Sequence, residues 1–252
     1  MHQLQWLRNP FFRGSTPFLI ILGLSLGMSS VALAAYHPPP GSSRPTGSSS
    51  STGTRGGCGI EEPTNLTILA PQGHLGQTAS TQPTVAWFVP AQNSYPLEVA
   101  LFEENGGQRD QLIHIFRGIK SSPGMMQLSL AERSVQLETG KTYRWQVAVL
   151  CNPNRPATAQ IAKARMKVVA LPATLKTQLA QTRDRLKQAN LYAEAGFWYD
   201  AFAETLAVAK SQPLIGLLKD LISLESGEPK QQLQQILAIE QREPEKATHA
   251  TP

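Results

Sequence analysis

The chain has 252 residues, with 23 lysines and arginines against 18 aspartates and glutamates, and a formal net charge of +5. The surplus is spread thinly: residues 58–170 carry 10 basic and 8 acidic groups, and residues 171–252 carry 9 and 10. No segment has the concentrated basic face that is typical of nucleic-acid binding, so we expect no nucleic-acid partner.

Residues 1–34 have the three-part order of a secretory signal peptide. Arg8 and Arg13 form a positive region, residues 18–28 form an apolar run, and Ala32-Leu33-Ala34 is a small-x-small cleavage site. Cleavage after Ala34 predicts a periplasmic or secreted protein that is not an integral membrane protein. The alternative is an uncleaved anchor, which the serines and glycines of this region disfavour. No cysteine follows the cleavage site, so we expect no lipid anchor.

Residues 35–57 are rich in serine, glycine, proline and threonine, and they contain one aromatic and no large aliphatic side chain. Such a segment offers too little apolar surface to offset the entropy that ordering would cost. We therefore predict a disordered spacer that follows the signal peptide.

Residues 58–170 predict an antiparallel β-sandwich. In the longest run, Tyr143 and Trp145 alternate with Arg144 and Gln146, so one face is buried and the other is wet. Short runs of this kind, separated by turn residues, are typical of a sandwich. The expected strands are 65–69, 85–89, 97–102, 112–116, 126–130, 142–150 and 161–169.

Two aromatic residues refine this prediction to an immunoglobulin- or fibronectin-III-like sandwich. Tyr143 stands at the start of the penultimate strand, six residues after Leu137. A tyrosine there that bonds back to upstream backbone is the tyrosine corner of such folds. Trp87, on the second expected strand, is similar to the core tryptophan of fibronectin type III domains.

The chain has two cysteines, Cys58 and Cys151. In an exported protein an even pair of cysteines predicts a disulfide. The loss of chain entropy on closing the loop from Cys58 to Cys151 would stabilise the folded state by roughly 4 to 5 kcal/mol. Because Cys58 precedes the first strand, the bond would tie the lead-in to the end of the sixth strand. The alternative is a pair of free buried thiols. No histidine neighbours either cysteine, so we expect no metal.

Residues 171–242 predict helices, because the apolar period changes to 3.6. One helix runs through Leu175 and Ala193 and ends at Gly196, a second begins near Trp198, a third near Pro213, and a fourth follows Pro229. We expect residues 243–252 to be a disordered tail. The segment from residue 191 to Pro213 resembles the middle of a tetratricopeptide repeat, but about three repeats are needed to bury their faces. We therefore expect the helices to pack on each other and on the sandwich.

Five short motifs in order resemble a cyanobacterial family of secreted proteins that is classed as a domain of unknown function. The resemblance spans about residues 53–225 and implies a signal peptide, a β region and a helical end, with no activity attached. The sequence departs from the family in its last strand, where residues 163–167 stand in place of an expected tryptophan. The motifs begin at Gly53, Pro83, Leu137, Leu150 and Gly196.

Catalytic motifs are absent from the sequence: it has no nucleophile elbow, phosphate-binding loop or zinc-binding His-Glu-x-x-His. His114 lies inside an apolar strand and His74 in a glycine-rich loop. The adjacent carboxylates Glu103-Glu104 point to opposite faces of an extended chain, so they do not converge. We therefore expect that the protein is not an enzyme and binds no cofactor.

Lys163, Arg165 and Lys167 alternate on the last strand and form a candidate partner surface for an acidic partner. The alternative, which we favour, is a charged edge that blocks strand-to-strand aggregation. The sequence thus predicts a non-enzymatic protein-binding or envelope-assembly module. The alternative is an extracytoplasmic hydrolase or carbohydrate-binding protein with a site at the β/helical junction.

Overall fold

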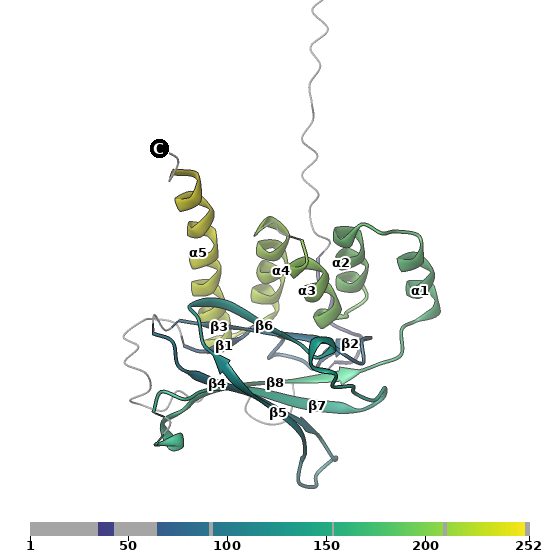
Figure 1. The fold of residues 1–252 in the computed structure, drawn as a ribbon. Helices are drawn as coiled ribbons and strands as arrows, with labels where there is room; N and C mark the ends of the chain where they lie inside the picture. Colours follow the sequence, from purple (N-terminus) through teal and green to yellow (C-terminus); the bar gives the residue numbers. More distant parts are fainter. Residues whose placement is uncertain (1–34, 43–64, 91–92, 153, 209–210, 250–252) are drawn as a thin grey trace, which may run out of the picture. The chain divides into compact units, whose positions relative to one another are not determined.

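The computed structural model describes residues 35–42, 65–90, 93–152, 154–208 and 211–249. All of them fall in one compact unit, and the order is a mixed β region followed by five helices, an α+β fold (Figure 1). The strands are β1 (Thr67–Ile68), β2 (Gly76–Thr78), β3 (Thr84–Val89), β4 (Pro96–Glu103), β5 (Gln111–Lys120), β6 (Gly124–Ser129), β7 (Thr142–Val149) and β8 (Gln160–Val168).

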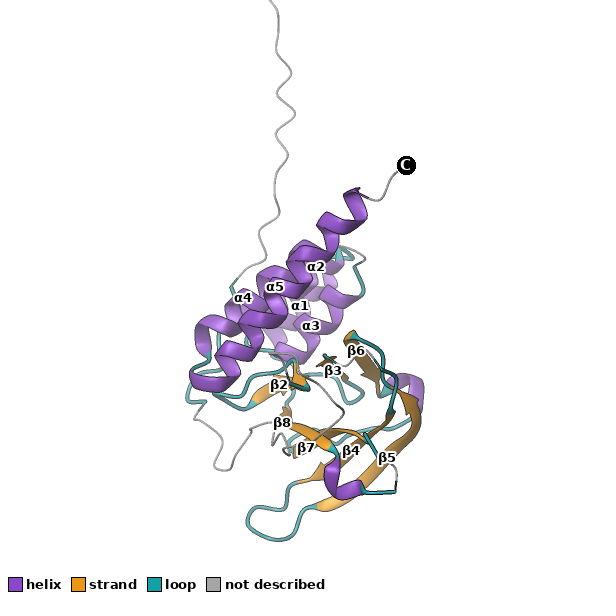
Figure 2. Cartoon of the chain, turned by 90° about the vertical axis from the view of Figure 1, so that its left-hand side faces the viewer, coloured by secondary structure: helices purple, strands orange, loops and turns teal. Residues whose placement is uncertain are grey.

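The strands form two sheets, shown in orange in Figure 2. The smaller sheet has the order β1-β3-β6 and the larger sheet has the order β2-β8-β7-β4-β5. All neighbours are antiparallel except β2 and β8, which run parallel. The expectation of a purely antiparallel region is therefore wrong at this pair.

Each of the seven predicted strands is present, with at least one end shifted. The largest shift is in β5, which continues four residues beyond the predicted end, to Lys120. The missed strand is β2, whose three residues Gly-Gln-Thr have no apolar alternation to mark them. It exists because Gly76, Gln77 and Thr78 pair with Met166, Lys167 and Val168 of β8.

Alternation determines which face of the larger sheet is buried. Along β7, Tyr143, Trp145, Val147 and Val149 are each at most 2% exposed, whereas the residues between them are half-buried. β8 has the same pattern. At the start of β7 the Tyr143 hydroxyl accepts a hydrogen bond of 2.9 Å from the Glu138 N–H, which is the upstream backbone contact that the sequence predicts.

The helices are α1 (Ala173–Ala180), α2 (Arg185–Glu194), α3 (Trp198–Leu206), α4 (Ser211–Leu224) and α5 (Gly227–His249). The single helix expected through Leu175 and Ala193 is two helices. The break lies before Asp184, whose carboxylate accepts the N–H groups of Leu186 and Lys187 and so caps α2. α5 continues to His249, so residues 243–249 are helical instead of a disordered tail.

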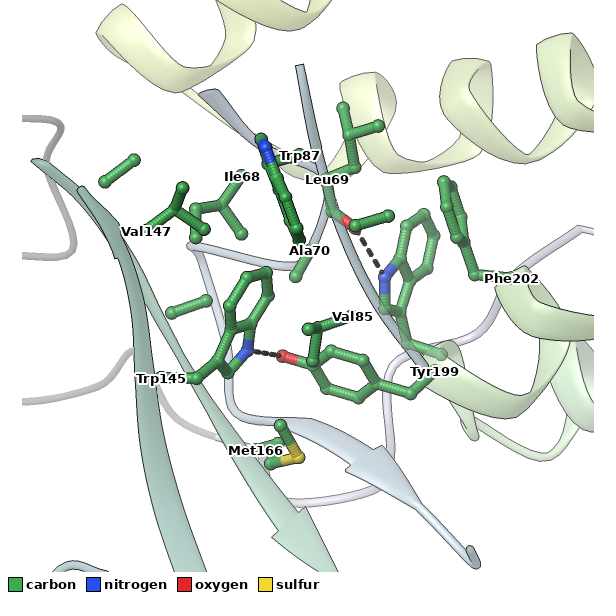
Figure 3. Close-up of a cluster of buried hydrophobic side chains, with 14 of the residues drawn as sticks. Ile68, Leu69, Ala70, Val85, Trp87, Trp145, Val147, Met166, Tyr199 and Phe202 are labelled. Atoms are coloured by element: carbon green, nitrogen blue, oxygen red, sulfur yellow. Dashed lines mark hydrogen bonds between the residues drawn. The ribbon is translucent and has the colours of Figure 1, made fainter. Parts of the chain in front are cut away.

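One buried core joins the sheets and the helices, because a single cluster of buried residues contains side chains from both. Trp145 of β7 donates its indole N–H to the Tyr199 hydroxyl of α3 at 3.0 Å (Figure 3). Trp198 of α3 donates its indole N–H to the Leu69 carbonyl at 3.1 Å. Phe197, Trp198 and Tyr199 are all buried. The predicted boundary between residues 170 and 171 separates strands from helices but does not divide the core.

Residues 35–42 also belong to the compact unit that contains the sheets and helices. They are the first part of the predicted disordered spacer, yet Tyr36 is only 3% exposed and belongs to the core. Its ring supplies the apolar surface that the rest of the spacer lacks. The remainder of the spacer, residues 43–57, lies outside the described residues, as do the predicted signal peptide, residues 1–34, and Cys58.

Candidate functional site

The predicted partner residues lie together on the outer face of the larger sheet. Lys163, Arg165 and Lys167 are half-buried and point away from the buried Ala164 and Met166, which lie between them on β8. Across the sheet, Arg165 pairs with Arg144 of β7, Lys163 with Gln146 and Lys167 with Thr142. The alternation predicted from the sequence therefore does bring the three cations to one face.

The alternative of a charged edge strand holds only for part of β8. Its last residues, Met166 to Val168, are covered by β2 on one side and by β7 on the other. Lys167 is therefore on an interior strand segment and does not protect an edge. The edges of the larger sheet are β2 and β5.

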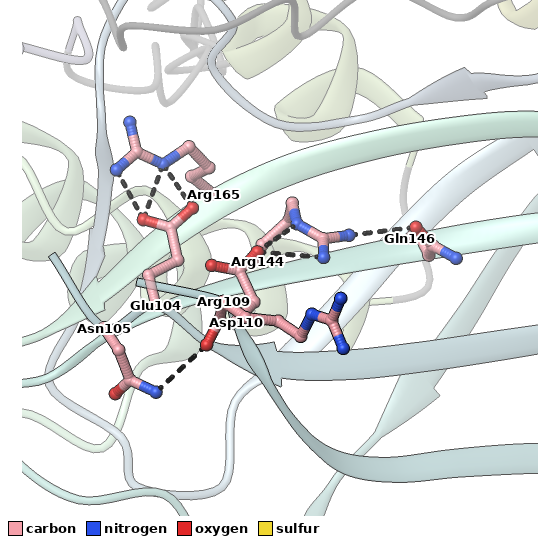
Figure 4. Close-up of polar contacts among 7 residues, drawn as sticks. All are labelled: Glu104, Asn105, Arg109, Asp110, Arg144, Gln146 and Arg165. Carbon is pink, nitrogen blue, oxygen red and sulfur yellow. Dashed lines mark hydrogen bonds and ion pairs between the residues drawn. The ribbon is translucent and has the colours of Figure 1, made fainter. Parts of the chain in front are cut away.

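The two arginines of this face are neutralised by carboxylates. Arg165 binds Glu104 through its Nε, which lies 2.7 and 2.8 Å from the two carboxylate oxygens, and through Nη2 (Figure 4). Arg144 binds Asp110 through two nitrogens, each 3.0 Å from Oδ2, and its guanidinium lies 4.1 Å from the centre of the Phe102 ring. These fork-shaped contacts fix both guanidinium groups.

The two lysines are different. Within the described ranges we find no ion pair for Lys163 or Lys167. They are four positions apart on an extended chain, so their α-carbons are about 13 Å apart along β8. The outer face thus presents two ammonium groups on either side of an Arg165–Glu104 pair.

A second group of polar side chains lies at the β/helical junction, where the alternative function requires a site. Asp200 of α3 is 9% exposed, and its carboxylate accepts the N–H groups of Ala79 at 2.9 Å and Ser80 at 3.2 Å. Burial raises the pKa of Asp200 to about 6, and the hydrogen bonds it accepts oppose that rise. Asp200 therefore fixes the chain that follows β2 onto α3.

Glu225, just after α4, acts in the same way. It is 4% exposed, and its Oε1 accepts the N–H groups of Gln72 at 2.7 Å and Gly73 at 2.9 Å. Beside it, His74 is buried, its Nε2 lies 2.8 Å from the Tyr36 hydroxyl, and burial lowers the pKa of His74 to about 4. His74 is therefore neutral at physiological pH and orders the loop between β1 and β2.

The remaining sequence candidates do not converge on these groups. His114 is exposed on β5, with its ring centre 4.5 Å from that of Phe116. Glu103 binds Lys141 at 3.0 Å while its neighbour Glu104 binds Arg165, so the two carboxylates have separate partners. Sequence reasoning missed Asp200 and Glu225, because each binds backbone amides more than a hundred residues away and no short motif marks such a contact.

Cys151 lies two residues after the end of β7 and is half-buried. Its predicted partner, Cys58, lies outside the described residues, so the disulfide stays a prediction. No three His, Cys, Asp or Glu side chains in the described part of the chain gather closely enough to hold a metal ion. None of the helices that the structure describes has the length and apolar character needed to cross a membrane.

Comparison with known proteins adds one finding. No curated protein matches the chain. A family model described as Domain of Unknown Function (DUF928) matches residues 50–222, a span that covers the strands, the cationic outer face and the helices as far as α4. This is more than half of the 252 residues, and it agrees with the resemblance that the five sequence motifs indicate. The chain therefore belongs to the DUF928 family.

Proposed function

We propose that this protein is an exported, non-enzymatic binding module whose outer sheet face takes an acidic segment of a partner protein. The observation that supports binding is the pair Lys163 and Lys167, which share a face and have no ion-pair partner among the described residues. The support for export is the signal-peptide pattern of residues 1–34.

The chemistry of the face favours an anionic partner over a neutral one. Arg144 and Arg165 are held by Asp110 and Glu104, so they form a fixed platform instead of free charges. Exposed ion pairs contribute only about 0.2 to 1 kcal/mol each, so two lysines alone predict weak, salt-sensitive binding. Specificity would then come from the spacing of the two lysines, whose α-carbons lie about 13 Å apart and so match residues four positions apart on an extended acidic segment.

We further propose an immunoglobulin-like sandwich as the scaffold of this face. The orders β1-β3-β6 and β2-β8-β7-β4-β5 support it, as does the Tyr143 hydroxyl bonded to Glu138. The α2–α3 pair, turned at Gly196, supports a tetratricopeptide-like hairpin. Both folds serve as binding scaffolds in other proteins.

Binding of a labelled glutamate-rich decapeptide to chain 35–252, measured by fluorescence anisotropy, tests this proposal. We expect binding that weakens as salt rises, no binding of a lysine-rich decapeptide, and at least a fivefold loss of affinity in Lys163→Gln/Lys167→Gln. The control Lys176→Gln/Lys187→Gln removes the same charge from exposed positions on α1 and α2 and should bind as the parent does. Equal affinity in the two double variants would contradict a specific role for the outer face.

Export has its own test. The intact mass of the protein recovered from outside the cytoplasmic membrane should correspond to a chain that begins at Ala35. A mass that retains residues 1–34 would favour the uncleaved anchor instead.

A further inference from the structure

The residues that follow the predicted cleavage site are built into the fold. Tyr36, the second residue after Ala34, is 3% exposed. Its ring centre lies 5.1 Å from that of Trp198, in an edge-on arrangement, and 5.7 Å from that of His74, in a stacked one. An aromatic side chain enclosed in this way fixes the register of the segment, because a shift by one residue would place Ala35 or His37 in the core.

Polar contacts hold the same register. The Tyr36 hydroxyl lies 2.8 Å from His74 Nε2, and the His37 N–H donates to the Ala193 carbonyl at 3.1 Å. At Gly196 a β-carbon would lie 3.0 Å from the His37 carbonyl oxygen and 3.0 Å from Pro39 Cγ. The segment therefore lies directly against the α2–α3 turn.

One carboxylate faces the start of this segment. The Tyr36 N–H donates to Asp220 Oδ2 of α4 at 3.0 Å. Asp220 is half-buried, and in the described part of the chain no lysine or arginine forms an ion pair with it. Partial burial raises the pKa of Asp220, and the Tyr36 N–H and the nearby His37 oppose that rise without forming an ion pair. A group with a permanent positive charge would therefore stabilise this carboxylate further.

We propose that Asp220 is a docking site for the α-ammonium group that cleavage after Ala34 creates on Ala35. The Tyr36 nitrogen lies 3.0 Å from Asp220 Oδ2, and the nitrogens of successive residues lie within about 4 Å of each other, so the Ala35 nitrogen is at most about 7 Å from this oxygen. Rotation of the terminal residue and of the Asp220 side chain can close that gap. In the uncleaved chain this nitrogen is an uncharged amide. Hydrolysis of the Ala34–Ala35 bond consumes one water, leaves a carboxylate on Ala34 and converts the amide into an ammonium group.

Processing would thus complete the fold. The new ammonium group pairs with Asp220, while Tyr36 and Pro39 hold it in place against α3 and the α2–α3 turn. A chain cut at another residue would place its ammonium group elsewhere. This inference shares only the predicted cleavage with the proposed function, since Lys163 and Lys167 take no part in it.

Equilibrium urea unfolding of four forms tests it: chain 35–252 with a free amine on Ala35, the same chain preceded by Gly-Ser-Gly, and each of these two chains with Asp220→Asn. Chain 35–252 contains every described residue. We expect the free-amine form to have an unfolding equilibrium constant about two- to fivefold smaller than the extended form, the range measured for partly exposed ion pairs. Asp220→Asn keeps an acceptor for the Tyr36 N–H but removes the charge, so it should abolish this difference.

The control Glu132→Gln removes an exposed carboxylate between β6 and β7, outside both the segment 35–42 and α4, and should preserve the difference. Equal stability of the free-amine and extended forms, or a difference that survives in Asp220→Asn, would overturn the inference. Peptide binding measured on the same samples separates this result from the proposed function. If the mass of the exported chain shows that it begins at a residue other than Ala35, the ammonium group that the inference requires does not form there, and the inference is wrong. The peptide-binding result does not depend on that mass.

Discussion

Two buried carboxylates, Asp200 and Glu225, bind the backbone of the segments on either side of β2. Asp200 accepts two backbone N–H groups from the segment after β2, and Glu225 accepts two from the segment before it. Of the two, Asp200 has its pKa raised to about 6 by burial, from an ordinary value of 3.8. In the folded protein this group therefore takes up a proton more readily than in the unfolded chain.

Asp200→Asn should change how stability depends on pH. Because the folded pKa is the higher one, the parent loses stability as pH rises from about 4 to 6, and the loss stays constant above pH 6. A shift of this size corresponds to about 3 kcal/mol. His74 acts in the opposite sense over the same window, because its lowered pKa makes stability fall as pH falls from 6.5 to about 4. The parent profile is therefore a sum of opposed contributions, and only the difference between variant and parent isolates Asp200.

Urea unfolding at pH 4, 5, 6 and 7 measures that difference. We expect the stability of Asp200→Asn relative to the parent to rise by about 2 to 2.5 kcal/mol between pH 4 and pH 7, whatever its value at pH 4, because part of the full effect already lies below pH 4. Asp184→Asn, which alters an exposed cap of α2, gives the background. A difference that is constant with pH would show that Asp200 does not titrate in this window.

At the scale of elements, the turn between α2 and α3 depends on one glycine. Gly196 has a φ of +84°, where L side chains are strained, and a β-carbon there would also meet His37 and Pro39. Gly140 has a similar φ of +91° but open space around its missing β-carbon. The two positions therefore share the backbone strain and differ in the close approach of the segment 35–42.

Gly196→Ala should destabilise chain 35–252 by more than Gly140→Ala does. The backbone conformation costs about 1 to 2 kcal/mol at both positions, and at Gly196 the contact with residues 37–39 adds to it. In a chain that begins at residue 43, the additional cost should disappear, so that the two variants become alike. Thermal unfolding of the four chains measures this, and an unchanged gap after truncation would contradict the packing of the segment on the turn.

The elements also show what the sequence can and cannot predict. Strands such as β7 and β8 were predictable because their own alternation separates a buried face from a wet one. β2 was not, because three residues without alternation become a strand only by pairing with β8. The same distinction applies to the candidate site: alternation places Lys163, Arg165 and Lys167 on one face, but the contact of Arg165 with Glu104, 61 residues away, depends on the tertiary fold.

For the whole molecule, the central question is whether the sheets and helices unfold together. The Tyr199 hydroxyl is one of the polar links between them: it accepts the indole N–H of Trp145 at 3.0 Å and donates to the Arg165 carbonyl at 3.2 Å. A β-carbon on Gly76 would lie 2.9 Å from the Tyr199 ring, so β2 also packs closely on α3. With a core that continues through both regions, we expect a single cooperative transition.

Tyr199→Phe tests this expectation. Removing the hydroxyl leaves the buried Trp145 N–H and Arg165 carbonyl without this partner, which costs about 1 to 3 kcal/mol for a buried group. Unfolding can be followed by the tryptophan fluorescence of the core and by the far-ultraviolet circular dichroism of the helices. If the molecule unfolds as one unit, Tyr199→Phe should shift the urea midpoints of both transitions to lower values by the same amount. The control Tyr192→Phe removes a hydroxyl from a half-buried ring that packs on Phe197. It should change the free energy of unfolding measured by either signal by no more than about 0.5 kcal/mol. Two separated transitions, of which Tyr199→Phe moves only one, would instead indicate that the strands and helices are independent domains that merely touch.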